Sequence, residues 1–433
     1  MTTQRYQKID PSLFINNRKQ LAQHLKPNSV VVLNASDIMP AGTDDVLPFR
    51  QNRDLFYLSG IDQAETILVL YPDASQASWR EMLFLRETHE HTRIWEGQQY
   101  TPAAAQELAG IAHIHTLDEF RTTFHRLMGQ ATHVYLNTNE HARAANTVQT
   151  RDARFIAWCK HHYPLHQYER LAPLMQQLRA VKSAIEIDLM REACAITEKG
   201  FRKILPLIRP GIMEYALEAE LIAEFIRNRA QGFAYEPIIA SGANACVLHY
   251  KANNQPCQAE DVILVDVGAA YAHYCADLTR VMPVSGHFTQ RQRAVYHAVL
   301  RVMQQAKQML VPGNDLTTYH QAVGKVMEEE LVGLGLLDRI DIRNQDPNKP
   351  AYKKYFMHGT SHHIGLNTHD VGNVYRKFEP GMVLTIEPGI YIREEGLGIR
   401  LEDNVVIRED GLEDLMATMP IEAEAIEALM NAR

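Results

Sequence analysis

Carboxylates placed inside apolar strand patterns constrain this chain more than any other feature of its sequence. In the C-terminal half, Asp266 and Glu387 each lie in or at the end of an apolar run, and a second acid follows each, at Asp277 and Glu402. A buried carboxylate is costly unless a partner balances its charge. Since no equal set of Lys or Arg accompanies these acids, the pattern indicates metal ions as the partners.

One imidazole completes the predicted ligand set. Carboxylate-rich sites with one or few imidazoles suit hard or borderline divalent ions, Mn²⁺ above all. Five protein ligands are too many for one catalytic zinc and suit two bridged ions. The predicted ligands are Asp266, Asp277, His362, Glu387 and Glu402.

The spacing of the first two acids predicts a hairpin. Asp277 follows Asp266 by 277 − 266 = 11 residues, and a turn near Tyr271 would place the two acids on neighbouring strands. Cross-strand neighbours lie roughly 5 Å apart. The two carboxylates would then be close enough to share a metal ion.

The last quarter of the chain repeats this arrangement. The spacing Asp266-x-Gly268 matches Glu387-x-Gly389, and Asp277 matches Glu402. A Pro-Gly pair also precedes a helical pattern in each half, at 210–211 and 312–313. This weak self-similarity predicts two related halves about a pseudo-two-fold axis, each of which supplies a pair of acids.

These segments resemble the metallopeptidases of the pita-bread fold, the group of methionine aminopeptidase, prolidase and aminopeptidase P. The N-terminal half resembles aminopeptidase P in particular, and the segment at 178–187 resembles the family's entry into its catalytic domain. The resemblance is carried by Asp266-Val-Gly268, Asp277-Leu-Thr-Arg280, His358-Gly-Thr-Ser-His362, Glu387-Pro-Gly389, Gly398-Ile-Arg-Leu-Glu402 and, in the N-terminal half, Pro48-Phe-Arg-Gln-Asn-Arg-Asp-Leu-Phe-Tyr-Leu-Ser-Gly60.

The resemblance implies an α/β (α+β) protein of two domains. A creatinase-like α/β domain at 1–172 would be followed by a catalytic pita-bread domain at 173–433, with pseudo-two-fold symmetry. In relatives the first domain drives oligomerisation and can contribute to a neighbouring active site. Trp95 aligns with a residue of that kind, although a lone Trp is more often a core or interface anchor.

The implied activity is release of the N-terminal residue from peptides with proline in the second position. Asp277 and Glu402 would bridge two ions that share one hydroxide, Asp266 would complete one ion, and His362 and Glu387 the other. Metal coordination lowers the pKa of water towards 7. Glu387 would also accept the proton of the bridging water.

Further polar residues join the site through the same resemblance. His249, His358 and His369 match positions that contact the substrate, stabilise the oxyanion or pass a proton to the leaving nitrogen. Arg400, two residues before Glu402, would balance carboxylate charge or orient that ligand.

Composition agrees with a cytoplasmic enzyme. The net charge of −8 argues against nucleic acid as the main partner, and no apolar run approaches the roughly 20 residues of a membrane span. The N-terminus has no signal-peptide pattern. The cysteines, five in number and without a CxxC pair, indicate reduced thiols. The expected partners are proline-containing peptides and other copies of the chain, as a homodimer or homotetramer.

Three alternatives stay open. Prolidase, which cuts Xaa-Pro dipeptides, is separated from aminopeptidase P mainly by the motif at 48–60. Creatinase-like C–N hydrolysis uses this fold without metals, and a non-enzymatic binding module would typically lose metal ligands. The complete ligand set argues against creatinase-like hydrolysis and against a binding module.

Hydrophobic patterning predicts the elements. Strands are expected at 30–33, 66–71, 82–85 and 133–136, and the segment 163–168 is expected to cross into the second domain. Helices are expected at 183–205, 214–229, 289–310 and 315–334, with Ser183 as N-cap and Glu186 completing a capping box. The polar segment 338–355 is expected to be irregular.

Overall fold

The computed structural model describes residues 4–144 and 147–432. The chain divides into two compact units, one of which is Lys8–Arg179. The other is Ala180–Arg433, joined by the first residues of the chain up to Gln7. The units divide after Arg179, seven residues beyond the expected boundary at 172.

A mixed sheet forms the centre of the Lys8–Arg179 unit. Within the described residues it has six strands in the order β4-β3-β2-β1-β5-β6. β2 runs antiparallel to both β1 and β3, whereas the other neighbours are parallel. The strands are β1 (Ser29–Asn34), β2 (Ile67–Leu70), β3 (Glu81–Leu85), β4 (His113–Thr116), β5 (His133–Leu136) and β6 (Gln167–Arg170).

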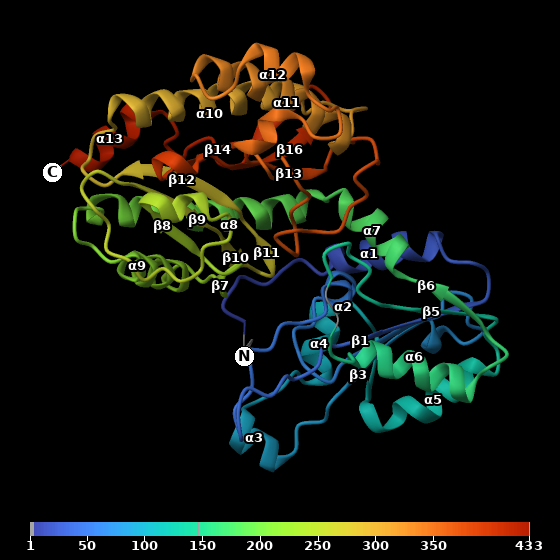
Figure 1. Ribbon diagram of the computed structural model, residues 1–433. Helices are drawn as coiled ribbons and strands as arrows, with labels where there is room; N and C mark the ends of the chain where they lie inside the picture. Colours follow the sequence, from blue (N-terminus) through green and yellow to red (C-terminus); the bar gives the residue numbers. More distant parts are fainter. Residues whose placement is uncertain (1–3, 145–146, 433) are drawn as a thin grey trace. The chain divides into compact units, whose positions relative to one another are not determined.

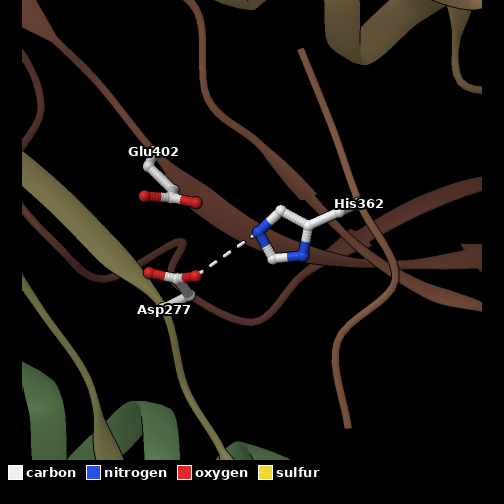
Figure 2. Close-up of side chains that lie close together, drawn as sticks. All are labelled: Asp277, His362 and Glu402. Carbon is white, nitrogen blue, oxygen red and sulfur yellow. Dashed lines mark ion pairs between the residues drawn. The ribbon is translucent and has the colours of Figure 1, made fainter. Parts of the chain in front are cut away.

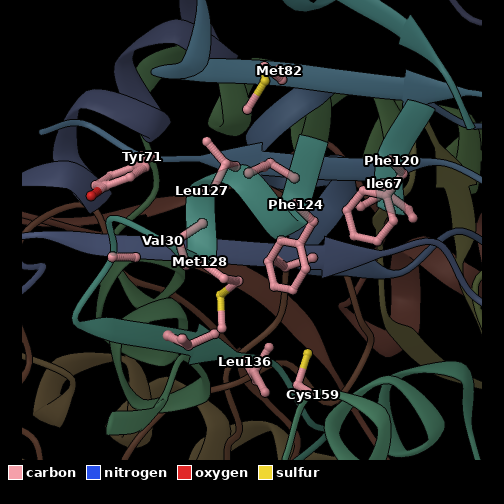
Figure 3. Close-up of a cluster of buried hydrophobic side chains, with 14 of the residues drawn as sticks. Val30, Ile67, Tyr71, Met82, Phe120, Phe124, Leu127, Met128, Leu136 and Cys159 are labelled. Atoms are coloured by element: carbon pink, nitrogen blue, oxygen red, sulfur yellow. The ribbon is translucent and has the colours of Figure 1, made fainter. Parts of the chain in front are cut away.

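Helices cover this sheet, and a buried hydrophobic core lies between the sheet and helices α5 and α6. Val30 and Val32, alternate residues of β1, belong to the same buried cluster as Phe120 and Phe124 of α5, and Figure 3 shows this cluster. Alternation places every second strand residue on one face of the sheet. The helices are α1 (Ser12–Gln23), α2 (Arg53–Ser59), α3 (Glu90–Glu96), α4 (Pro102–Ala109), α5 (Phe120–Met128) and α6 (Arg151–His162).

The two edge strands of the sheet differ from expectation. The four predicted strands are present as β1, β2, β3 and β5, but β4 was not predicted. The segment 163–168 was expected to leave the domain, and this is wrong, because β6 begins at Gln167 and pairs with β5. Both strands are polar and only partly buried, so neither produces the apolar run that marks a central strand.

Four long helices of the Ala180–Arg433 unit lie where the apolar pattern predicts them. Ser183 caps α8 through the capping box with Glu186, which confirms that prediction. Helix α10 is capped in the same way by Thr289 and Gln292. The four are α8 (Ala184–Ile204), α9 (Glu214–Arg227), α10 (Gln290–Met309) and α11 (Leu316–Gly333).

The strands of this unit repeat one arrangement, which confirms the expected pita-bread architecture with its two related halves. In each half a long antiparallel pair (β9 with β12, β13 with β16) is interrupted by a smaller pair (β10 with β11, β14 with β15). Figure 1 shows β12, β13, β14 and β16 between α8 on one side and α10 and α11 on the other. The strands are β8 (Ile238–Ser241), β9 (Val262–Val267), β10 (Ala269–Tyr271), β11 (Tyr274–Cys275), β12 (Leu278–Pro283), β13 (Val383–Ile386), β14 (Gly389–Ile392), β15 (Leu397–Arg400), β16 (Asp403–Arg408) and β17 (Gly411–Asp414).

The polar segment 338–355 is more regular than expected. It contains α12 (Arg339–Asn344) and a 3₁₀ turn at Ala351–Lys354. Helix α12 begins where it does because Asp338, its N-cap, accepts a hydrogen bond from the backbone N–H of Ile340. Among the helices of the described residues, none combines the length and the apolar content needed to cross a bilayer.

Candidate metal centre

Asp266 lies near the end of a strand that is buried along its whole length. It lies on β9 between Val265 and Val267. Its carboxylate accepts a hydrogen bond from the Tyr235 hydroxyl and forms an ion pair with Arg400. Burial raises the pKa of Asp266, and Arg400 opposes that effect. The acid is thus held in place from two sides before any metal is considered.

Asp277 lies on the return of the first hairpin. It precedes β12, whose Thr279 faces Asp266 across the strand pair. The turn falls at Ala272 and His273, which both have positive φ. Asp277 therefore lies diagonally from Asp266 on the neighbouring strand, just beyond the paired residues.

The glycine two residues after the acid in each half is required by close packing. A Cβ at Gly268 would lie 1.8 Å from the carbonyl oxygen of Ala276. A Cβ at Gly389 would lie 2.7 Å from the hydroxyl of Tyr391. Since real side-chain atoms do not approach so closely, the acid-x-Gly spacing reflects how tightly the ligand-bearing strands pack.

His362 points its free nitrogen at the acids. Its backbone N–H donates to the Thr385 hydroxyl at 3.2 Å, and its Nδ1 donates to the His363 carbonyl at 2.9 Å. Its Nε2 lies 3.5 Å from Asp277 Oδ2 and 3.6 Å from Glu387 Oε1. A carbonyl that fixes one ring nitrogen and leaves the other toward carboxylates is the arrangement of metal-binding histidines.

Three of the predicted ligands converge on one point. Asp277, His362 and Glu402 each offer a ligand atom within 4.8 Å of the others, and Figure 2 shows the three side chains facing a common space. Glu402 Oε2 accepts from the Thr279 hydroxyl at 2.8 Å. Its Oε1 is buried without a hydrogen-bond partner, as expected of an oxygen that binds a cation.

The electrostatics of the cluster also favour cations. Burial, and then the charge of Asp277, raise the pKa of Glu402 well above its usual value. Burial likewise raises the pKa of Glu387 to about 7, with His362 opposing. The single charge of Arg400 does not balance four carboxylates. A donor set of carboxylates and one imidazole fits divalent ions of the hard or borderline kind.

His358 is held as a neutral imidazole. Its Nδ1 lies 2.8 Å from the Gly359 carbonyl and its Nε2 lies 2.8 Å from the Tyr391 hydroxyl. Because a carbonyl can only accept, Nδ1 carries the proton, and Nε2 accepts from Tyr391. Burial, and then the charge of Arg400, lower the pKa of His358 to about 3. Both ring nitrogens are therefore engaged within the protein.

The other two predicted histidines are exposed. The ring of His369 packs edge-on against that of His362 with centroids 4.3 Å apart. His249 lies close enough to His358 to lower its pKa. Both side chains are exposed.

Arg400 reaches two ligands by different routes. It forms the ion pair with Asp266 directly, and it donates to the Thr279 hydroxyl at 3.2 Å, which in turn binds Glu402. It also donates to the Tyr391 hydroxyl at 2.8 Å. The guanidinium thus links both halves of the site.

Three residues of this network were missed by the sequence reasoning. Tyr235 binds Asp266, Tyr391 links His358 with Arg400, and Thr279 binds Glu402. Thr279 lies inside the motif that follows Asp277, so its position was a signal. Nothing local in the sequence marks the two tyrosines, because Tyr235 is 31 residues from Asp266 and Tyr391 is 33 residues from His358.

Two family models match this chain. The model of metallopeptidase family M24 matches residues 188–409, and that of the N-terminal domain of aminopeptidase P matches residues 14–135. Among curated relatives, an Xaa-Pro aminopeptidase of Haemophilus influenzae is 32% identical over 98% of both chains. One of Escherichia coli is 34% identical over 97% of both chains.

Solved structures of aminopeptidases match this chain along nearly its whole length. The chain resembles aminopeptidase PepP of Pseudomonas aeruginosa with a TM-score of 0.89 and 31% identity, over 98% of each chain. It resembles a zinc-substituted aminopeptidase P of Escherichia coli in complex with product with a TM-score of 0.87 and 34% identity, over 98% of this chain and 99% of that one. These matches confirm the resemblance inferred from the motifs: the chain belongs to metallopeptidase family M24 and is a hydrolase of the aminopeptidase class.

Proposed function

We propose that this enzyme releases the N-terminal residue from peptides with proline in the second position. The observation that carries the proposal is the convergence of Asp277, His362 and Glu402, together with the buried and unpartnered Oε1 of Glu402. The relatives are named as Xaa-Pro aminopeptidases, and this name and the matching aminopeptidase P domain support proline as the second residue. A proline leaving group offers no N–H to the enzyme, so binding must use its ring.

Two divalent ions are the cofactors we propose. Asp277 and Glu402 would bridge them, Asp266 would complete one site, and His362 and Glu387 the other. The hardness of the donor set supports Mn²⁺. When bound, such ions supply a nucleophile at neutral pH by lowering the pKa of water from about 15.7 towards 7, and they polarise the scissile carbonyl.

The surrounding residues would orient the peptide and move its protons. We assign His369, whose ring packs against that of His362, and His249 to stabilise an oxyanion or to protonate the leaving nitrogen. The exposure of both side chains supports this assignment. His358 is neutral and engaged at both nitrogens, so we assign it a positioning role through Tyr391. Glu387 would accept the proton of the attacking water.

We also propose self-association and a cytoplasmic location. Trp95 is 76% exposed on α3 and is therefore no core residue of this unit. An exposed Trp is typical of an interface anchor, which supports a homodimer or homotetramer. The five cysteines are all free and buried, as in proteins of reducing compartments.

The deciding experiment removes metal, restores Mn²⁺, and compares an Xaa-Pro dipeptide with an Xaa-Pro-Yaa tripeptide. We expect metal-dependent release of the first residue mainly from the tripeptide. Glu402→Gln should abolish release, whereas the matched variant Glu413→Gln, on β17 of the same unit, should retain it. Cleavage of the dipeptide alone would identify a prolidase. Failure to cleave either peptide with metal bound would refute the proposal.

A further inference from the structure

The segments that carry Asp277 and Glu402 hold one another through their backbones. Thr279 and Glu402 form an isolated antiparallel bridge, in which the Glu402 N–H donates to the Thr279 carbonyl at 3.0 Å. The Thr279 hydroxyl also donates to Glu402 Oε2 at 2.8 Å. Glu402 is thus fixed at backbone and side chain by a residue that lies two positions after Asp277.

Asn404 makes the reverse contact. Its side-chain Oδ1 accepts from the backbone N–H of Asp277 at 2.9 Å, and its Nδ2 donates to the Asp277 carbonyl at 2.7 Å. Asn404 is fully buried, and the thiol of Cys194 lies 3.6 Å from its Oδ1. One amide therefore satisfies both backbone groups of Asp277, in a place where water cannot replace it.

Arg280 fixes the other segment. It has no exposed surface, and its guanidinium donates to the carbonyl of Glu402 at 2.7 Å and to that of Thr279 at 3.0 Å. It also binds Asp403 at 2.6 Å. A buried guanidinium with several well-placed acceptors is rigid, because each lost contact would leave a buried charge unpaired.

The charges around Arg280 balance without the metal site. Asp403 also pairs with Lys307 at 2.7 Å, and Lys307 pairs with Asp414 at 2.6 Å. Two cations thus face two acids, so the group is neutral as a whole. It needs no charge from the metal ligands, and it can hold the ligand segments whether or not metal is bound.

We propose that Asn404 and Arg280 form a reciprocal clasp that presets the separation of Asp277 and Glu402 for metal binding. Each residue lies near one ligand in sequence and binds the backbone of the other. The inference rests on the proposed function, because it takes these two acids as metal ligands. The clasp keeps the segments of the two acids from separating when metal is absent. Both are positioning residues that act through the ligands.

The test compares Asn404→Ala with Gln292→Ala. Gln292 is the matched control, because its buried amide also accepts from one backbone N–H, at Thr289, and donates to one carbonyl, at Glu260. It lies on α10, and both of these partners lie outside the segments that carry Asp277 and Glu402. Both variants should lower the urea midpoint of the metal-free protein. Mn²⁺ affinity and stoichiometry are then measured on folded protein by titration calorimetry at pH 7.5.

We expect Asn404→Ala to weaken Mn²⁺ binding by about 10- to 100-fold, the usual loss when a partner of a metal ligand is removed, and Gln292→Ala to leave it within about twofold. Equal Mn²⁺ affinity in wild type and Asn404→Ala, with a lowered urea midpoint, would overturn the clasp and leave Asn404 as a purely structural residue. If Asn404→Ala does not fold, Asn404→Ser is used, and unchanged Mn²⁺ affinity in that variant would likewise overturn it.

The same samples separate this inference from the proposed function. A wild-type protein that binds Mn²⁺ and cleaves the tripeptide, beside an Asn404→Ala variant of unchanged affinity, would overturn the clasp alone. A wild-type protein that binds no Mn²⁺ would overturn both. A wild-type protein that binds two Mn²⁺ but cleaves no Xaa-Pro peptide would overturn the function, and the affinity comparison would still decide the clasp.

Discussion

Replacing Glu387 by glutamine tests the electrostatic description of the metal-free site. Burial raises the pKa of this carboxyl from 4.5 to about 7. A tenfold change in proton affinity corresponds to about 1.4 kcal/mol, so the difference corresponds to about 3 kcal/mol. The folded protein holds this proton to a higher pH than the unfolded chain does. The contribution of Glu387 to the free energy of unfolding therefore falls between about pH 4.5 and pH 7 and stays reduced above it.

Glutamine cannot ionise, so the unfolding free energy of Glu387→Gln does not fall with pH in this way. The comparison of the two proteins cancels most of the background from other groups. That matters here, because burial lowers the pKa of His358 to about 3, which makes the contribution of that residue rise with pH over part of the same range. From pH 4.5 to pH 8, the metal-free variant should gain about 3 kcal/mol of unfolding free energy relative to wild type.

The assay is urea denaturation of both proteins in chelator at a series of pH values. Glu413→Gln is the control of opposite sign. Burial would raise the pKa of Glu413, but hydrogen bonds from Arg408 and Arg191 outweigh burial and lower it below 4.5. This variant should therefore lose stability relative to wild type as pH rises towards about 4.5 and show no further change above it. With saturating Mn²⁺, wild type should be more stable to urea than Glu387→Gln, because wild type keeps all its metal ligands and bound metal stabilises the folded protein. A difference between wild type and Glu387→Gln that does not change with pH in chelator would refute the reasoning.

The remaining predictions concern other parts of the molecule. Phe124→Ala should cost about 3–5 kcal/mol of unfolding free energy in urea, because it empties a fully buried position in the Lys8–Arg179 core; a cost below about 1 kcal/mol would contradict the packing. Ser183→Ala should cost about 1 kcal/mol by removing the cap of α8, and Ser183→Asp should restore most of that stability. His369→Ala should lower kcat by about 10²-fold or more at unchanged Mn²⁺ content; equal loss of Mn²⁺ and activity would instead make His369 a support of His362.

Much of the fold could be predicted because its signals are local. The apolar periods of α8 to α11 depend on residues three and four apart, and the capping box of α8 spans Ser183 to Glu186. The central strands β1 and β9 are buried along their whole length, so they read as continuous apolar runs. The polar edge strands β4 and β6 were missed for the opposite reason, since none of their residues is fully buried and they show no apolar pattern.

The sequence by itself determined the ligand candidates, because buried carboxylates in apolar strands and the acid-x-Gly spacing are visible without any coordinates. Only the tertiary structure decided how these acids meet. Asp277 and Glu402 are held through Asn404 and Arg280, and Asp266 is paired with Arg400. Each of these contacts joins residues more than 100 positions apart. Their geometry depends on the packing of two half-domains, and no spacing along the chain records it.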